Sequence, residues 1–314
     1  MQLIRGQVDL PRSHQGCALT IGTFDGLHLG HQALIARLLS HAQRLGEPAV
    51  MLTFEPMPRE FLSPGDPPAR LTTFRERWRI LAKAGIDYLW LLHFGEALRN
   101  LSAEDFAQLL ARRLRPRVVV VGHDFRFARK GEATAAALAA AGERLGFAVD
   151  IVPAVRLAGE RVSSSGVRAA LACGDFARAE RWLGRRYSMR GRVIGGKRLG
   201  RDLGFPTANL ALGRRRAPVA GIFAVQVHGA ANAALPGVAS LGTRPTIGGG
   251  EALLEAHVFD FSDDLYGREI EVEFAAKLRD EQRFATLEAL TTQMQRDAAD
   301  ARRILGGART GLNG

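Results

Sequence analysis

The sequence has 314 residues, of which 46% are hydrophobic, and its 43 basic and 32 acidic side chains give a net charge of +11. This length suits one large or two ordinary domains, and the hydrophobic fraction is normal for a globular protein. No stretch approaches the ~18 consecutive apolar residues that a transmembrane helix needs, so we expect no membrane association.

The basic charge suits a protein whose ligands carry phosphates, and it also permits nucleic-acid binding. Much of it is arginine on predicted helices, such as Arg75 and Arg77, which we expect on solvated faces. No basic stretch is interleaved with aromatics for stacking bases, and we predict no nucleic-acid partner. Cys17 and Cys173 lack metal-ligand spacing and Met1–Arg12 lacks a signal-peptide core, so we expect a reducing, cytoplasmic location.

The most informative stretch follows the apolar run Cys17–Ile21, which predicts a buried strand. This stretch, Gly22–His31, reads GTFDGLHLGH and leads into a helical pattern near residues 31–45. We therefore expect a strand, a glycine-rich turn and a helix start. Glycines let such a turn bend tightly and let a ligand approach its backbone.

Two histidines of this turn, His28 and His31, stand three residues apart where the helix begins, so their side chains can point the same way. The free N–H groups of the first helical turn and the helix dipole favour a phosphate at that position. Two imidazoles beside it can donate hydrogen bonds to charge that develops on a phosphoryl group. The alternative is an ordinary strand-to-helix turn with two solvated histidines.

The first half of the chain alternates strand and helix patterns. Predicted strands are Val50–Phe54, Tyr88–Leu92, Val118–Val121 and Phe147–Val152, and predicted helices lie near 72–84, 102–114 and 132–145. Continuous apolar strands separated by helices predict a parallel sheet with helices on both faces, and ligands of such sheets gather at the carboxyl ends of the strands. The turn Gly22–His31 and the stretch Gly122–Phe127 both follow strand ends, so we expect them on the same rim.

After about Arg186 the pattern changes to a period of two, which is typical of antiparallel strands. Ile270, Val272 and Phe274, for example, alternate with glutamates. Several such segments, separated by glycine turns and followed by one amphipathic helix, predict a small barrel closed by a C-terminal helix. The predicted fold class is therefore α/β plus β, with a parallel-sheet domain before a small antiparallel barrel.

A basic glycine-rich stretch, Gly191–Arg198, nearly matches a phosphate-binding P-loop, but Arg198 stands in place of the magnesium-binding Ser or Thr. We reject that interpretation, although the backbone of such a loop can still wrap phosphates. Thr207 and Asn209 lie two residues apart on an extended segment, so both side chains face the same side. Their oxygens suit Mg²⁺, and an ordinary polar loop is the alternative.

Glu255 lies on the predicted strand Leu253–Phe261, on the face opposite the apolar Leu254, Ala256 and Val258. A carboxylate at this position is either an exposed strand residue or a general base that takes the proton of an attacking alcohol. The spacing alone leaves both interpretations open.

Together these motifs resemble the bacterial bifunctional riboflavin kinase/FAD synthetase family. In the first half the resemblance rests on Gly22–His31, Phe54–Pro56, Arg70–Thr72, Gly122–Phe127 and Ser163–Ser165 followed by Arg168. In the second half it rests on Gly200–Asn209, Gly221–Val225, Glu255–His257, Asp264–Gly267 and Leu278–Arg279 with Phe284. The likeness covers nearly the whole chain in the right order.

The resemblance implies a Rossmann-like adenylyltransferase domain at residues 1–186, a six-stranded riboflavin kinase barrel with a C-terminal helix at 187–306, and a flexible tail at 307–314. In the kinase domain, Glu255 would be the general base for the ribityl 5′-hydroxyl, and Thr207 and Asn209 would hold Mg²⁺. The implied ATP contacts of this domain are Gly195, Lys197, Gly200, Arg201 and Thr207.

In the adenylyltransferase domain, the resemblance implies that His28 and His31 bind the ATP phosphates and stabilise charge at the α-phosphorus. Ser164 and Arg168 would hold the departing β- and γ-phosphates. Further ATP contacts are implied at Gly22, Phe24, Asp25 and Gly30, and FMN contacts at Asp124, Phe125 and Arg126. FMN phosphate would be the nucleophile, and it is ionised at neutral pH, so no enzyme nucleophile is required.

The implied activity is a two-step synthesis of FAD, with riboflavin, ATP, FMN, FAD and pyrophosphate as ligands and Mg²⁺ as the metal. After Phe127 the family usually continues Gly-x-x-Arg-x-Gly-Asp, whereas this chain has the shorter Ala128–Glu132. An alternative is therefore a riboflavin kinase whose adenylyltransferase half is weakened or inactive. Gly166 stands where the family commonly has a larger residue, and we expect it to loosen the start of its helix.

Two alternatives come from other classes of protein. A nucleic-acid-binding protein would use the barrel as an OB-like module, but only 7% of the residues are aromatic and the histidine pair would stay unexplained. A synthetase acting on tRNA would share the His-x-Gly-His element, but no anticodon-binding or editing extension is recognisable. Salt-dependent RNA retention without ATP turnover would favour these two. Weak self-association is compatible with the sequence.

Overall fold

The computed structural model describes residues 1–6, 9–11, 13–195, 204–214, 216–243 and 252–307. Contacts divide the chain into two compact units, Met1–Pro68 with Phe74–Ser163 and Ala69–Thr73 with Ser164–Gly314. The short segment Ala69–Thr73 therefore groups with the second half of the chain. The domain limit at residue 186 stays a prediction, and the expected tail lies, from residue 308 on, outside the described residues.

The first unit is built on a six-stranded sheet in which neighbouring strands run parallel. Its strands are β1 (Gln2–Arg5), β2 (Cys17–Ile21), β3 (Ala49–Glu55), β4 (Tyr88–His93), β5 (Pro116–Gly122) and β8 (Ala148–Val152). Their order is β1-β4-β3-β2-β5-β8. The predicted Rossmann-like sheet is confirmed, and the two motifs that follow β2 and β5 emerge from neighbouring strands at the same edge.

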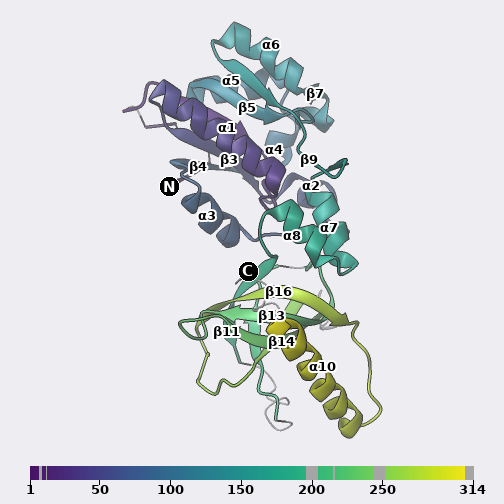
Figure 1. Ribbon diagram of the computed structural model, residues 1–314. Helices are drawn as coiled ribbons and strands as arrows, with labels where there is room; N and C mark the ends of the chain where they lie inside the picture. Colours follow the sequence, from purple (N-terminus) through teal and green to yellow (C-terminus); the bar gives the residue numbers. More distant parts are fainter. Residues whose placement is uncertain (7–8, 12, 196–203, 215, 244–251, 308–314) are drawn as a thin grey trace. The chain divides into compact units, whose positions relative to one another are not determined.

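Helices cover both faces of this sheet (Figure 1). The helical segments of this unit are α1 (Leu29–Leu45), α2 (Pro58–Leu62), α3 (Phe74–Lys83), α4 (Glu96–Arg99), α5 (Ala103–Leu114), the 3-10 turn η1 (Arg129–Gly131) and α6 (Ala135–Leu145), of which α1 and α3 pack on one face and α5 and α6 on the other. Two small ribbons pair β6 (Arg126–Phe127) with β7 (Ala133–Thr134), and β9 (Arg156–Leu157) with β10 (Glu160–Arg161). The four predicted helices are confirmed within a few residues, whereas α2 and α4 were not predicted.

Strand β2 shows why a continuous apolar run becomes a central strand. All five of its side chains are buried; Cys17, Leu19 and Ile21 belong to the cluster on one face of the sheet, and Ala18 belongs to the cluster on the other face. Leu19 packs with Leu110 of α5 and Leu138 of α6, whereas Ala18 packs in the cluster of Leu38 of α1. Because this strand has no solvent face, its sequence shows no polar alternation.

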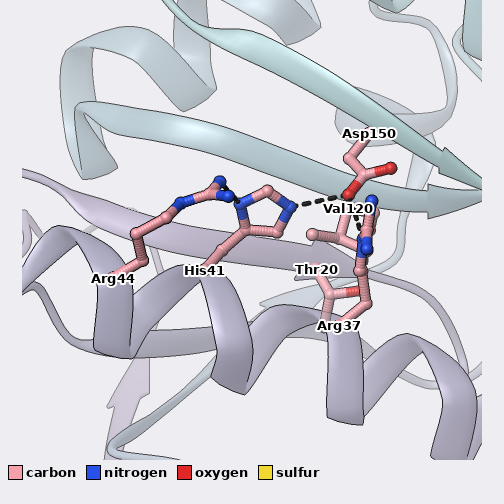
Figure 2. A network of polar contacts seen from close by, with 6 residues as sticks. All are labelled: Thr20, Arg37, His41, Arg44, Val120 and Asp150. Atoms are coloured by element: carbon pink, nitrogen blue, oxygen red, sulfur yellow. Dashed lines mark hydrogen bonds and ion pairs between the residues drawn. The ribbon is translucent and has the colours of Figure 1, made fainter.

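A polar network ties α1 to β8 (Figure 2). The Asp150 carboxylate accepts a hydrogen bond from Nε of Arg37 at 2.5 Å and lies 2.6 Å from Nε2 of His41. Arg44 donates to Nδ1 of His41 at 2.6 Å, so Nε2 is the ring nitrogen that donates to Asp150. The network fixes the helix that begins at the glycine-rich turn.

The second unit joins two helices, α7 (Ser164–Ala172) and α8 (Phe176–Leu183), to a closed barrel. In the described part of the chain the barrel has six antiparallel strands in the order β11-β12-β15-β14-β13-β16. These are β11 (Ser188–Ile194), β12 (Ala208–Ala211), β13 (Gly221–His228), β14 (Leu235–Thr243), β15 (Ala252–Val258) and β16 (Glu269–Arg279), and α10 (Leu287–Gly307) follows them. The predicted barrel and C-terminal helix are confirmed.

Alternate residues fill the barrel, as the period of two predicts. Ile270, Val272 and Phe274 of β16 are all buried. Phe176 of α8 stacks on Phe274 with ring centroids 6.0 Å apart and meets Phe223 edge-on at 5.8 Å. Helix α8 therefore belongs to the barrel core.

Gly166 has a packing role that its sequence position did not reveal. A Cβ at this residue would lie 2.0 Å from Trp182 of α8, far inside van der Waals contact. Gly166 therefore lets α7 and α8 approach closely, and the burial of Trp182 offsets the low helix propensity of glycine.

We predict that Asp150→Asn lowers the melting temperature at pH 7 and that this difference shrinks at pH 3. Burial raises the pKa of Asp150, but hydrogen bonds from Arg37 and His41 outweigh it and hold that pKa below its ordinary value. Folding therefore favours the charged form above the pKa of a free Asp, about 3.9, and this stabilisation is lost as the pH falls through the lower folded-state pKa.

Thermal unfolding of wild type and D150N at both pH values measures this effect, with the exposed Asp263→Asn as the control. An equal loss of melting temperature at pH 7 and pH 3 would contradict the electrostatic origin of the network's contribution.

Candidate active sites

The glycine-rich turn Gly22–His31 folds around its own apolar side chains. Phe24 and Leu27 adopt left-handed backbone conformations, with φ of 50° and 48°, and both side chains are buried. Residues other than glycine rarely adopt these conformations, so the packing of the Phe24 ring and the Leu27 side chain against α1 must stabilise them. Packing as well as glycine therefore sets the shape of the turn.

His28 and His31 lie side by side at the start of α1. Their ring centroids are 3.8 Å apart with planes 17° from parallel, and His31 meets Phe24 edge-on at 5.3 Å. His28 also caps the helix, because its Nδ1 accepts a hydrogen bond from the backbone N–H of His31 at 3.4 Å. A Cβ at Gly30 would lie 3.1 Å from the His28 ring, so glycine at this position makes room for the capping side chain.

The surroundings keep His31 neutral. Burial lowers the pKa of His31 well below its ordinary value, and the charges of His28 and Arg77 lower it further. Its Nδ1 is buried and has no hydrogen-bond partner among the described residues. A buried polar atom of this kind points to a ligand, because such atoms are otherwise almost always paired.

Arg77 of α3 is a site residue that the sequence analysis placed wrongly. We expected it on a solvated face, but its side chain is only 2% exposed. Its guanidinium donates to the carbonyl of Thr23 at 2.6 Å and to the Glu55 carboxylate at 3.1 Å. Arg77 stands four residues before the buried Leu81, and this spacing was the available signal for burial. Arg77 therefore holds the glycine-rich turn against α3.

The second motif, Gly122–Phe127, directly follows β5. Its Asp124 forms an ion pair with Arg161 of β10, which the sequence analysis did not foresee. Its two phenylalanines stack with ring centroids 5.5 Å apart, and its Arg126 begins β6. The next residue, Ala128, has a φ of 65°, a conformation that glycine adopts at lower cost.

The remaining predicted residues of the adenylyltransferase site fall in two places. Gly22, Phe24, Asp25 and Gly30 all belong to the glycine-rich turn, and Asp25 is buried. Ser164 and Arg168 lie on α7 in the second unit, where Nε of Arg168 donates to the carbonyl of Ala69 at 2.6 Å.

In the barrel, two of the three predicted oxygen-bearing residues lie on neighbouring strands, and the third lies directly before one of them. Asn209 of β12 pairs with Glu255 of β15 in antiparallel register, and Thr207 directly precedes β12. Ser240 of β14 pairs with Glu255 from the other side. Asn209 is buried and Glu255 is half-buried, and both Thr207 and Glu255 line one cavity.

This cavity has a volume of about 310 Å³ and lies within the second unit. Its apolar lining comprises Phe205, Ile222, Val238, Ala239, Phe284, Leu290 and Met294. On its wall Arg279 donates to Asp297 at 2.7 Å and lies 5.7 Å over the Phe284 ring. Such a lining suits a flat, partly polar ring system. The sequence analysis treated the C-terminal helix as packing alone and missed its contribution to this cavity.

Part of the predicted kinase site lies outside the described residues, namely Lys197, Gly200 and Arg201, whereas Gly195 is described at the end of β11. Within the described ranges, no three His, Cys, Asp or Glu side chains gather as a metal site. No helix in the described part of the chain is long and apolar enough to cross a membrane.

Residues 10–166 match the sequence model of a family described as FAD synthetase, and residues 183–305 match that of riboflavin kinase. Bifunctional riboflavin kinase/FMN adenylyltransferases from Pseudomonas fluorescens and Escherichia coli K12 are 46% and 44% identical to this chain. The alignments cover 97% and 98% of this chain and 98% of each relative. A solved structure described as a macrolide-efflux protein from Streptococcus pneumoniae has 30% identity and a TM-score of 0.79, over 95% of this chain and 97% of its own.

We predict that Arg77→Met raises the pKa of His31, because it removes a positive charge that disfavours the protonated ring. Ring-resonance titration by NMR measures the change, and Arg75→Met on the exposed side of α3 is the control. The folded pKa of His31 lies below that of a free His, about 6.5, so the unfolded chain binds more protons and wild-type stability falls as the pH drops below that value. An unchanged His31 pKa in R77M would contradict this electrostatic account.

Proposed function

Because the chain belongs to the bifunctional riboflavin kinase/FMN adenylyltransferase family, we propose that it makes FAD from riboflavin in two steps. The first step transfers a phosphoryl group from ATP to riboflavin and gives FMN. The second step transfers the adenylyl group of another ATP to FMN and releases pyrophosphate. The observation that carries this proposal is the presence in one chain of a histidine-bearing turn on a parallel sheet and a Glu255-lined cavity in a barrel.

In the barrel, Glu255 is the general base that takes the proton of the ribityl 5′-hydroxyl as this oxygen attacks the γ-phosphorus of ATP. Its place on the cavity wall supports this role, because the apolar lining beside it suits the flavin ring. Phosphoryl transfer needs mainly alignment and charge neutralisation, so one carboxylate base is sufficient on the protein side. Gly195, Lys197, Gly200 and Arg201 belong to the loop that binds the ATP phosphates.

Thr207 and Asn209 are the residues that would hold Mg²⁺ in this site. Asn209 is in register with Glu255, and Thr207 lines the same cavity as Glu255, so the donors that the two candidate ligands offer are a hydroxyl and an amide oxygen. This donor set fits Mg²⁺ rather than a metal that prefers thiolate or imidazole ligands. When bound, the ion supplies positive charge that neutralises the nucleotide phosphates.

In the first half, His28 and His31 donate hydrogen bonds to the ATP phosphates while the FMN phosphate attacks the α-phosphorus. The neutral state of His31 and its buried Nδ1 support this role. Ser164 and Arg168 hold the pyrophosphate that leaves. Gly22, Phe24, Asp25 and Gly30 contact ATP, and Asp124, Phe125 and Arg126 contact FMN.

The proposed ligands are riboflavin, ATP, FMN, FAD and pyrophosphate, with neither nucleic acid nor membrane among the partners. Free thiols at Cys17 and Cys173, together with the use of ATP, support a cytoplasmic location. A silent adenylyltransferase half is the less favoured alternative, because the FAD synthetase match runs through the short loop Ala128–Glu132.

Incubation of the purified protein with riboflavin, ATP and Mg²⁺, followed by chromatography of the flavins over time, tests the proposal. We expect FMN to appear first and FAD to follow. Accumulation of FMN without FAD would refute the second activity, and conversion of neither flavin would refute both.

We predict that Glu255→Gln lowers the rate of FMN formation by about 10²–10⁴-fold, because the amide cannot accept the hydroxyl proton. FAD formation from supplied FMN should stay unchanged. Glu269→Gln, at the exposed start of β16, is the matched control. Loss of both activities in a folded E255Q protein would show that the assignment of two separate sites is wrong.

We predict that His31→Ala lowers the rate of FAD formation from FMN by about 10²–10³-fold, because a hydrogen-bond donor to the developing charge is lost. Riboflavin phosphorylation should persist. His93→Ala, at the exposed end of β4, controls for the removal of a histidine from the same sheet. Wild-type FAD formation by H31A would exclude His31 from the reaction.

A further inference from the structure

Side chains of the second half of the chain hold the segment Ala69–Thr73, although in the sequence it lies between α2 and α3 of the first unit. Three successive carbonyl oxygens of this segment accept hydrogen bonds. The donors are Nε of Arg168 to Ala69 at 2.6 Å, Nη1 of Arg214 to Arg70 at 3.2 Å, and the Tyr187 hydroxyl to Leu71 at 3.1 Å. The backbone of the segment is thus fixed at consecutive residues.

Arg214 and Tyr187 act together in this arrangement. Nη1 of Arg214 donates to the Tyr187 hydroxyl at 3.1 Å and lies 3.4 Å from the carbonyl oxygen of Leu71. Arg214 and Tyr187 are each 3% exposed, and Leu71 is fully buried. A buried guanidinium is costly unless oxygen atoms satisfy its donors, so hydrophobic packing alone does not explain an arginine at this place.

A role in riboflavin phosphorylation does not explain why Arg214 and Tyr187 are at this place. Arg214 follows β12 and Tyr187 precedes β11, so both come from the part of the chain that matches riboflavin kinase. Neither residue lines the described barrel cavity. Their hydrogen bonds go instead to the segment that also binds Arg168 and that continues directly into α3, the helix of Arg77.

We propose that Arg214 and Tyr187 are positioning residues for FMN adenylylation, and that they act by holding Ala69–Thr73 in the conformation that orients Arg168. The bond from Nε of Arg168 to the Ala69 carbonyl sets the direction of its guanidinium. A shift of this carbonyl therefore moves the guanidinium of Arg168, which would bind the departing pyrophosphate. Small displacements of such a group lower the reaction rate by large factors. The inference rests on the proposed function, because the role of Arg168 does.

The test uses Arg214→Met in the full-length protein. Riboflavin phosphorylation, FMN adenylylation and the reverse reaction of FAD with pyrophosphate are assayed separately. We expect adenylylation to fall by at least about tenfold with a raised KM for pyrophosphate, whereas phosphorylation stays within about threefold of wild type. Tyr187→Phe removes one hydroxyl and should slow adenylylation by about threefold while the rate of phosphorylation stays at the wild-type value.

Two further variants separate a positioning role from a structural one. Arg302→Met is the matched control, because Arg302 donates to both oxygens of Asp260 at 2.8 Å and lies 4.3 Å over Phe259. Its loss weakens the contact of α10 with the barrel and leaves Ala69–Thr73 untouched. Arg168→Met tests whether Arg214 acts through Arg168. If it does, the double variant R168M/R214M has the same KM for pyrophosphate as R168M alone.

The proposal would be overturned if R214M lost both activities to the same extent and its melting temperature fell as it does in R302M. Additive effects of R214M and R168M, or normal adenylylation in R214M and Y187F, would overturn it as well. If R214M does not fold, the split in Y187F decides alone. A wild-type protein that forms FMN but no FAD would instead refute the proposed function, and this inference with it.

Discussion

Burial of the parallel sheet on both faces is the constraint on which the first site depends. Strand β2 lies between two helix layers, so only its ends are open to ligands. Because β2 and β5 are parallel neighbours, the motifs that follow them emerge at the same edge. The same burial extends to the turn itself, where the packing of Phe24 and the hydrogen bonds of Arg77 fix its shape. Burial, followed by the charges of His28 and Arg77, lowers the pKa of His31 and keeps its ring neutral.

In the second unit the candidate site depends on which residues of neighbouring strands lie opposite each other, and not on burial of a sheet between helix layers. The antiparallel pairing of β12 with β15 places Asn209 opposite Glu255, so two residues 46 positions apart lie side by side on neighbouring strands. Alternate residues of the same strands fill the core, and α10 covers the barrel beside the cavity. The pairing thus brings a candidate base beside candidate metal ligands, and the helix supplies the apolar wall.

The sequence predicted those features that follow from local pattern. Continuous apolar runs and a period of two separate the parallel sheet from the barrel, and the spacing of His28 and His31 predicted their shared orientation. The carbonyl that Arg77 binds, the pairing of Asp124 with Arg161 and the place of Ala69–Thr73 could not be predicted this way. Each depends on contacts between residues far apart in the chain, 54 positions in the case of Arg77 and Thr23. A charged side chain in a helix gives no sign of which distant carbonyl it will reach.

We propose that one chain carries two separate sites and that FMN leaves the first site before it binds at the second. Mixing E255Q with H31A in the presence of riboflavin, ATP and Mg²⁺ tests it most directly, because each variant retains the site that the other lacks. The account predicts that the mixture forms FAD after a lag, whereas either variant alone and the double variant do not. A mixture that forms no FAD, although each variant retains its expected single activity, would contradict the claim.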